Sequence, residues 1–321
     1  MRSTTLRPAL TSGASILVLI AVLGACDRSE RADGGSAETS AGLVSVDGSS
    51  TVLPMSKTAY ELFSGEQPGI QVIVHSSGTG GGFAKFCVGE TDISNASRPI
   101  DSSDEAPVCD ENGIGYTELQ IAIDAVTVVV HPELAVNCLT TEQLIELWRP
   151  GSPIDRWSDL DPRFPNQLIK LFGPGTDSGT YDFVANDVLG DVSGATRDDY
   201  EASEDDNVLA QGVAETAGAV GYFGYTYYEK YADSLRAVAI DDGDGCVKPS
   251  AETAQAGTYT PLSRPLFIYV SNEAYTKDTA VRRYTDYYID NLETIADAAQ
   301  FIALNDEQYN KTLSDHARLA D

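Results

Sequence analysis

The stretch Gly173 to Asp182, with the sequence GPGTDSGTYD, combines residue types that could bind an anion. It follows an apolar run (168–172) and precedes a predicted helix (181–189), so the pattern predicts a strand, a glycine-rich turn and a helix start. The first N–H groups of a helix have no partner within the helix, and the helix dipole places partial positive charge there. With the hydroxyls of Ser178 and Thr180 added, this turn could bind an anion without a lysine. An ordinary helix cap is the alternative interpretation.

Three further segments early in the chain carry similar donors. DGSSTVLP (47–54) and SSGTGGGF (76–83) each follow a predicted strand and lead into a predicted helix. A third predicted strand (91–96) ends at Ser97, Arg98 and Pro99, and so presents a cation. Open α/β sheets bind ligands at the carboxyl ends of their strands. We therefore expect these segments to contribute to one site.

Other chemistries fit the sequence less well. DSGT (177–180) matches an aspartic-protease motif, but the second copy needed for a carboxylate dyad is missing. No GxSxG elbow is present for a serine hydrolase. DDGDG (241–245) lacks the spaced glutamate of an EF-hand, and GTGGG (78–82) lacks the third glycine of a dinucleotide fingerprint. A structural role is the simpler interpretation of the three histidines, which are His75, His131 and His316.

The N-terminus has the pattern of a lipoprotein signal. Two arginines precede an apolar run (16–23) that is too short to span a bilayer and that ends in Leu-Gly-Ala-Cys. We predict that residues 1–25 are a signal peptide and that Cys26 carries lipid; an ordinary signal before an unmodified cysteine is the alternative. Residues 26–42 are nearly free of apolar side chains and predict a flexible tether. Asp27 resembles a signal that retains lipoproteins at the inner membrane, so we expect a periplasmic protein anchored to the inner (cytoplasmic) membrane.

The chain is strongly acidic. It has 21 Lys and Arg against 49 Asp and Glu, which gives a formal net charge of −28. This charge argues against nucleic acid and anionic lipid headgroups as partners. An anionic ligand would have to be bound by local donors against an unfavourable overall field.

Four cysteines remain beyond Cys26. An even number in an exported chain predicts two disulfides, for which three pairings are possible. We favour Cys87 with Cys109, which closes a short excursion, and Cys138 with Cys246, which flanks an inserted segment. Zinc is the alternative, but no CxxC pair or nearby histidine supports it, and we expect no bound metal.

Strands and helices alternate along the chain, which predicts an α/β fold with two lobes. Two long apolar strands are expected, at 125–130 and at 265–270. Because they bracket an inserted segment, they predict two crossovers between the lobes, and therefore a hinge and a cleft.

Several motifs in order resemble one known family. They are DGSSTVLP, SSGTGGGF, GETDISNASRPI, GPGTDSGTYDF, ASEDDNVLAQGV, VGYFGYTYY and PLSRPLFIYV. Together they are similar to the phosphate-binding protein of the bacterial phosphate ABC transporter, and the ordered set is more specific than any single motif. The resemblance implies a type II periplasmic-binding-protein fold with a two-strand hinge and a central cleft. We expect residues 43–130 and 239–321 in lobe I and residues 131–238 in lobe II.

The resemblance also implies a function. We expect high-affinity binding of inorganic phosphate and its delivery to the membrane permease of a phosphate ABC transporter. The protein would be a monomer without a cofactor and without catalytic activity. Its site would use donors from three turns and one cation: Ser50, Thr51, Val52, Thr79, Arg98, Ser178, Gly179 and Thr180.

The sequence departs from the family pattern at two positions. Many relatives have an aspartate where Arg98 stands, which accepts the phosphate proton, and an arginine where Pro174 stands. A guanidinium at Arg98 could pair with phosphate through two parallel bonds. The proton acceptor, and with it selectivity over sulfate, stays open, with Asp177, Asp205 and Asp206 as candidates.

Three alternatives stay open from the sequence. The first is a receptor for another tetrahedral oxyanion. The second is a phosphate-ester hydrolase, which would need a nucleophile with a base or a pair of metal ions. The third is a purely adhesive surface role.

Overall fold

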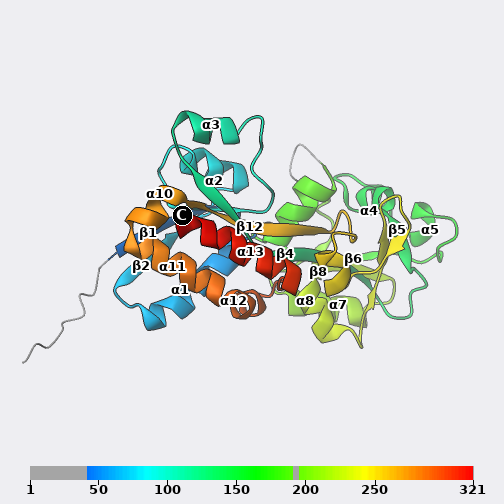
Figure 1. The fold of residues 1–321 in the computed structure, drawn as a ribbon. Helices are drawn as coiled ribbons and strands as arrows, with labels where there is room; N and C mark the ends of the chain where they lie inside the picture. Colours follow the sequence, from blue (N-terminus) through cyan, green and yellow to red (C-terminus); the bar gives the residue numbers. More distant parts are fainter. Residues whose placement is uncertain (1–41, 191–194, 321) are drawn as a thin grey trace, which may run out of the picture. The chain divides into compact units, whose positions relative to one another are not determined.

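The computed structural model describes residues 42–190 and 195–320 (Figure 1). The described residues belong to one compact unit, Thr39–Asp321. The predicted signal peptide (1–25), Cys26 and the predicted tether up to Ala41 lie outside the described residues. Within the described ranges, every helix is too short or too polar to cross a lipid bilayer.

A large mixed sheet organises the fold. Its strands follow the order β2-β1-β3-β12-β4-β8-β6-β7, and β9 pairs with β4. A smaller sheet has the order β11-β10-β5. The strands are β1 (Gly42–Gly48), β2 (Ile70–Val74), β3 (Ile93–Ala96), β4 (Tyr116–Val130), β5 (Cys138–Thr140), β6 (Lys170–Gly173), β7 (Glu201–Ala202), β8 (Ala219–Gly224), β9 (Arg236–Ala237), β10 (Ala239–Asp241), β11 (Cys246–Val247) and β12 (Ser263–Ser271).

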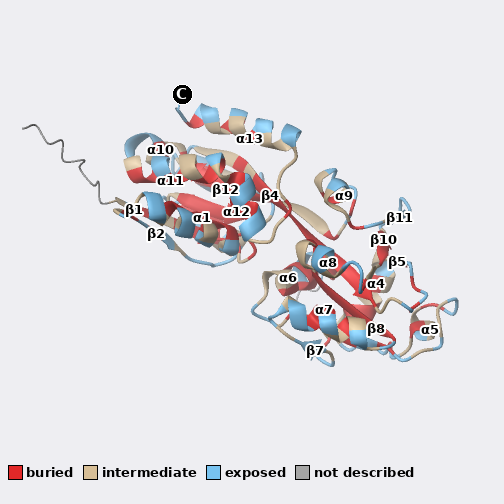
Figure 2. Cartoon of the chain, turned by 90° about the horizontal axis from the view of Figure 1, so that it is seen from below, coloured by how far each residue is buried: buried red, intermediate tan, exposed pale blue. Residues whose placement is uncertain are grey.

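The strands β4 and β12 connect the two lobes, as the two apolar runs predicted. From Tyr116 to Ala125, β4 pairs with β12, and from Val126 to Val130 it pairs with β8. Its second half is buried without interruption, because its branched apolar side chains are covered on both faces (Figure 2). The two-lobed α/β fold with a two-strand hinge is therefore confirmed.

Helices cover both faces of the first lobe's sheet. Along β12, Leu266, Ile268 and Val270 belong to one core, while Phe267 and Tyr269 belong to another, as expected for side chains that alternate across a strand. Five helices and the terminal turn η2 (Arg318–Ala320) pack on the first core; the helices are α1 (Leu53–Glu66), α10 (Asn272–Lys277), α11 (Thr279–Asp290), α12 (Leu292–Ala298) and α13 (Asp306–Ala317). Two helices, α2 (Thr79–Phe86) and α3 (Ala106–Glu111), pack on the second core.

The second lobe has its own core around Trp148 and Trp157, which are both fully buried. At the start of α4, Thr140 and Gln143 form a capping box. The helices of this lobe are α4 (Thr141–Trp148), α5 (Trp157–Leu160), α6 (Gly179–Asp182), the π-helix η1 (Phe183–Val188), α7 (Asp206–Glu215) and α8 (Tyr225–Tyr231). Helix α9 (Ala251–Gln255) contributes Ala254 to a separate small core with Ile123, Ala125, Tyr225 and Ile302.

The exact lobe boundaries, which we expect at residues 130/131 and 238/239, stay a prediction. Ile240, Tyr259 and Leu262 pack in the core of the second lobe. This packing supports a proposal in which the chain changes lobe inside β4 and at the start of β12.

Both predicted disulfides are present. Cys87–Cys109 joins the end of α2 to α3 within the first lobe. Cys138–Cys246 joins β5 to β11 across the small sheet, over a sequence separation of 108 residues.

Candidate anion-binding cleft

A cleft of about 440 Å³ lies between the two lobes. It is lined by the first turn (47–54, leading into α1), the second turn (76–83, leading into α2), the end of β3 and the second lobe. Four of the predicted residues line it: Ser50, Thr51, Thr79 and Arg98. The second lobe contributes Asp182, Phe183, Asn186 and Asp187, and β12 contributes Ser263 and Arg264. The structure therefore brings together residues that are more than 200 positions apart in the sequence.

The first turn leads into α1 with several donors free. Within the described residues, the N–H groups of Ser50, Thr51 and Val52 donate to no acceptor. Helix α1 has no side-chain cap, and Pro54 occupies its first turn, where the missing N–H costs nothing. The Val52 side chain is wholly buried in the core of the first lobe, so only its backbone could take part in binding.

The second turn is fixed to the first by the buried carboxylate of Asp47. One oxygen of Asp47 accepts from Gly48 N–H (2.7 Å), from Ser77 N–H (2.9 Å) and from the Ser77 hydroxyl (2.9 Å), and the other oxygen pairs with Lys85. Burial raises the pKa of Asp47, but Lys85 and these donors outweigh it and hold the pKa below its usual value. Gly78 precedes α2 with φ +79°, a conformation that favours glycine. Asp47 thus places Thr79 at the cleft.

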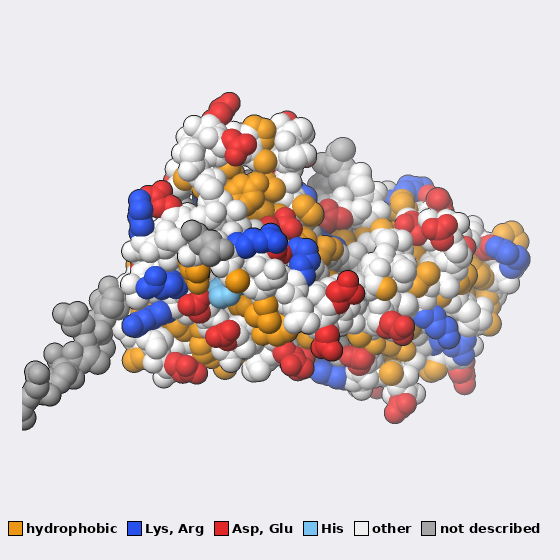
Figure 3. All heavy atoms as spheres, in the orientation of Figure 1, with side chains coloured by type: hydrophobic (Ala, Val, Ile, Leu, Met, Phe, Trp, Pro, Cys, Tyr) orange, Lys and Arg blue, Asp and Glu red, His pale blue; other side chains and the backbone are white. Residues whose placement is uncertain are grey.

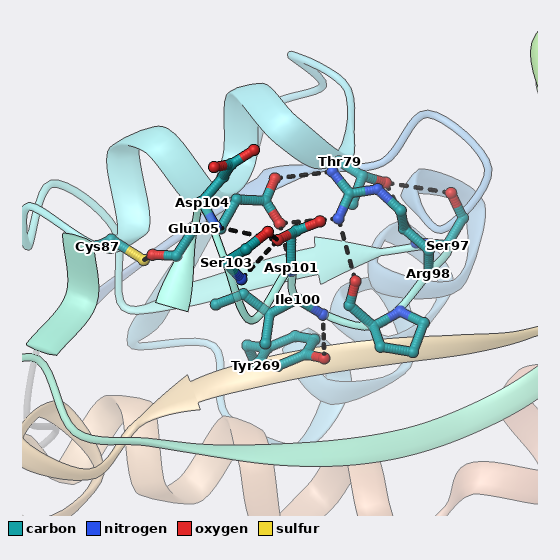
Figure 4. Close-up of polar contacts among 11 residues, drawn as sticks. Thr79, Cys87, Ser97, Arg98, Ile100, Asp101, Ser103, Asp104, Glu105 and Tyr269 are labelled. Carbon is teal, nitrogen blue, oxygen red and sulfur yellow. Dashed lines mark hydrogen bonds and ion pairs between the residues drawn. The ribbon is translucent and has the colours of Figure 1, made fainter. Parts of the chain in front are cut away.

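Arg98 leaves the end of β3 at the rim of the cleft (Figure 4). Its guanidinium pairs with both oxygens of Glu105, at 2.8 and 2.7 Å, and donates to Pro99 O at 3.0 Å. The Arg98 side chain is 46% exposed. The predicted cation is therefore at the cleft, but held by a carboxylate of its own lobe.

Arg264 is the functional candidate that the sequence reasoning missed. It comes from β12, lines the cleft and is only 12% exposed. Its guanidinium donates to Thr51 Oγ1 (2.8 Å), pairs with Asp124 (3.3 Å) and with Asp187, and lies over the Phe183 ring. The signal was present in the sequence, because Arg264 is a charged residue within PLSRPLFIYV, which is otherwise a buried hinge strand.

The third turn (173–182, leading into α6) lies against the first turn (47–54, leading into α1). Ser178 caps α6 by accepting from Thr180 N–H at 3.1 Å. A Cβ atom added at Gly179 would lie 3.0 Å from Thr51 Cα. Ser178 and Gly179 are not among the residues that line the cleft, and Thr180 lines a neighbouring cavity. Their role in binding stays a prediction.

Comparisons with known proteins assign the chain to a family. The family described as PBP superfamily domain matches residues 34–291. The chain belongs to the PBP superfamily. Its sequence is 43% identical to Protein SphX of Synechocystis sp. over 83% of this chain and 80% of that protein. It is 37% identical to Phosphate-binding protein PstS of Staphylococcus saprophyticus, over 94% of this chain and 90% of that protein.

A solved structure is similar over most of this chain. The crystal structure of a possible phosphate binding protein from Planctomyces limnophilus is 38% identical, with a TM-score of 0.83, and covers 88% of this chain and 99% of that one. These findings confirm the family predicted from the sequence, the substrate-binding proteins of phosphate ABC transporters. The family comprises binding proteins for transport rather than enzymes.

Carboxylates also line the cleft of this PBP-superfamily chain. Asp182 accepts from the Ser50 hydroxyl at 3.0 Å, and Asp187 pairs with Arg264. Asp177 and Asp205, which were candidate proton acceptors, are not among the lining residues, and Asp206 lines the neighbouring cavity. Burial raises the pKa of Asp124, and the Arg264 charge opposes that rise. Asp182 and Asp187 are therefore the carboxylates best placed to meet a ligand.

Proposed function

We propose that this protein binds inorganic phosphate with high affinity in the cleft and delivers it to the permease of a phosphate ABC transporter. One observation carries the proposal. A single cleft contains the guanidinium groups of Arg98 and Arg264, the hydroxyl of Thr79, and the N–H groups of Ser50 and Thr51, which donate to no acceptor within the described residues. The relatives named as phosphate-binding proteins support the same ligand.

The cleft suits an anion in spite of the acidic chain. Acidic side chains are scattered over the face of the molecule in Figure 3, and the formal net charge is −28. Backbone N–H groups and helix starts are fixed dipoles, so they stabilise a desolvated anion without mobile counter-ions. A guanidinium adds a planar pair of donors that matches two oxygens of a tetrahedral anion. Local donors therefore replace long-range attraction.

Lobe closure would couple binding to delivery. The first lobe offers the donors of α1 and α2, and the second lobe offers η1. A ligand favours closure only if it makes better contacts in the closed state than in the open state. We propose that phosphate does so by bridging these elements. The permease would then recognise the closed form, with the protein acting as a monomer.

The location belongs to the same proposal. We propose export by the signal peptide (1–25), lipid attachment at Cys26 and anchoring at the outer face of the inner (cytoplasmic) membrane. Mass spectrometry of the N-terminal peptide tests this step. Lipid on Cys26 supports the proposal, and an unmodified or uncleaved N-terminus contradicts it.

Thermal unfolding with added anions tests the ligand. The protein is first refolded to remove carried-over ligand, and phosphate, arsenate and sulfate are then titrated separately. A ligand at about one hundred times its dissociation constant adds about 2.7 kcal/mol to stability. We expect phosphate and arsenate to raise the melting temperature and sulfate to leave it unchanged. An equal rise with sulfate would indicate a general oxyanion receptor, and no rise with any anion would contradict the proposal.

A further inference from the structure

The chain turns back between Arg98 and Glu105, so that the Glu105 carboxylate meets the Arg98 guanidinium (Figure 4). Glu105 occupies the N-cap position of α3, and four residues later Cys109 joins α3 to the end of α2. One oxygen of Glu105 also accepts from Asp101 N–H at 2.8 Å. The Glu105 carboxylate is therefore held in place by the Asp101 backbone and by the disulfide-linked helix α3, independently of its contact with Arg98.

The contacts of Arg98 use only part of its donor set. A guanidinium has five N–H groups. Glu105 takes one from Nη1 and one from Nη2, and Pro99 O takes the second from Nη1. Among residues 42–190 and 195–320, no acceptor meets Nε–H or the second Nη2–H. These two donors lie on one edge of the group, with the spacing that binds two oxygens of one anion.

The pair lies directly over the start of α2. A Cβ atom added at Gly80 would be 3.7 Å from Arg98 Nη2 and 3.7 Å from a Glu105 oxygen. Thr79 and Gly80 both line the cleft with Arg98. The Arg98 guanidinium and its Glu105 partner therefore belong to the same small region as the N-terminal dipole of α2.

We propose that Glu105 is a positioning residue for phosphate binding, because it holds Arg98 by one edge and leaves the Nε/Nη2 edge for the ligand. This inference rests on the proposed phosphate site. Under this proposal, the Glu105 carboxylate strengthens phosphate binding, although its negative charge alone would weaken it. Removing a carboxylate near an anion should strengthen binding through reduced repulsion, whereas removing the support of Arg98 should weaken it.

Asp104 provides the matched control. It precedes Glu105 in the chain and carries the same charge, but within the described part of the chain its carboxylate makes no hydrogen bond or ion pair. Asp104→Asn therefore reproduces the charge change of Glu105→Gln without touching Arg98.

The experiment is a double-mutant cycle read by calorimetric titration with inorganic phosphate. We expect Glu105→Gln to weaken binding about three- to tenfold, as for coupled neighbours, and Asp104→Asn to leave it unchanged or slightly tighter. In an Arg98→Ala background, Glu105→Gln should cause no further loss. Far-ultraviolet circular dichroism checks the fold of each variant. If Glu105→Gln does not fold, Glu105→Asp, which shortens the side chain, takes its place in the cycle.

Three results would overturn the inference while the proposed function stands. The first is unchanged or tighter phosphate binding by Glu105→Gln. The second is an equal loss with and without Arg98. The third is unchanged binding by Arg98→Ala, which would remove Arg98 from the site. If the unsubstituted protein itself does not bind phosphate, the proposed function fails, and this inference fails with it.

Discussion

The Arg264 guanidinium lies over the ring of Phe183, with 3.8 Å between its central carbon and the ring centre. Arg264 belongs to the hinge strand β12 and Phe183 to η1 of the second lobe. A planar guanidinium stacks on an aromatic ring and still donates in its own plane to Thr51 and Asp124. Arg264 therefore connects the first turn, the hinge and the second lobe through one side chain.

Arg264→Lys should weaken phosphate binding at least about tenfold, which corresponds to about 1.4 kcal/mol. Lysine keeps the charge but loses the stacked plane and the fork of donors. Calorimetric titration measures the change. Arg149→Lys is the control, because Arg149 pairs with Glu146 on the surface. Equal affinity of Arg264→Lys and the unsubstituted protein would show that the site needs only a charge at this position.

Gly179→Ala should weaken phosphate binding without unfolding the protein. The new Cβ atom would lie 3.0 Å from Thr51 Cα and 3.2 Å from Thr51 Oγ1, so the third turn would have to move away from the first. Gly65→Ala is the control, because Gly65 is in α1 and has no neighbour within 4 Å of the added Cβ atom. Gly65→Ala should raise stability by up to about 1 kcal/mol and leave affinity unchanged. Unchanged affinity in Gly179→Ala would show that the close approach is not needed.

Asp187→Asn should reduce the preference for phosphate over sulfate. The Asp187 carboxylate lines the cleft and repels any bound anion, but it can accept a hydrogen bond from a protonated phosphate oxygen. Sulfate at neutral pH has no such proton. We expect the ratio of the sulfate to the phosphate dissociation constants to fall in Asp187→Asn, as measured by competition titration. A constant ratio would assign the proton acceptor elsewhere, with Asp182 as the next candidate.

The two disulfides should differ in their effect on binding. Replacing Cys138 and Cys246 by serine should lower stability by about 2–5 kcal/mol, with little change in phosphate affinity, since the small sheet contributes no residue to the cleft lining. Replacing Cys87 and Cys109 should lower both, since that bond holds the helix that carries Glu105. Chemical denaturation and calorimetric titration measure the two quantities. Equal affinity in both serine pairs would argue against this difference.

Asp206→Asn should stabilise the protein at neutral pH but not in acid. Burial first, and then the neighbouring Asp205 and Glu204, raise the pKa of Asp206 from 3.8 to about 6. The folded state holds the Asp206 proton more tightly than the unfolded state does, so ionised Asp206 disfavours folding. This destabilisation grows as the pH rises from about 3.8 to about 6. Melting temperatures should show a much larger difference between the two proteins at pH 7.5 than at pH 4. A difference that does not depend on pH would assign the effect to another property of the first turn of α7, where Asp206 lies.

The sequence alone predicted the architecture well, for physical reasons that are local. Continuous apolar runs revealed β4 and β12, and the glycine-rich turns after strands revealed the starts of α1, α2 and α6. The disulfide pairs also followed, from the even number of cysteines in an exported chain. Each of these features depends on residues close in the sequence or on export of the chain, so each can be predicted from the sequence alone.

The site was predicted only in part, because its remaining contacts depend on chain segments far apart in the sequence. No spacing rule connects Arg264 to Thr51, Asp124 and Asp187, which are brought together by the crossing of β4 and β12. The partner of Arg98 was also hidden, although Glu105 is only seven residues away. Its position depends on how the disulfide-linked excursion folds back over α2.

The shared strand β4 has a consequence for how the protein unfolds. The pairing of β4 changes from β12 to β8 between Ala125 and Val126, so a single strand completes the sheets of both lobes. Loss of either sheet would strip hydrogen bonds from a strand that the other sheet needs. The two lobes should therefore unfold in one cooperative transition, and a ligand held between them would protect amide hydrogens from exchange throughout both cores.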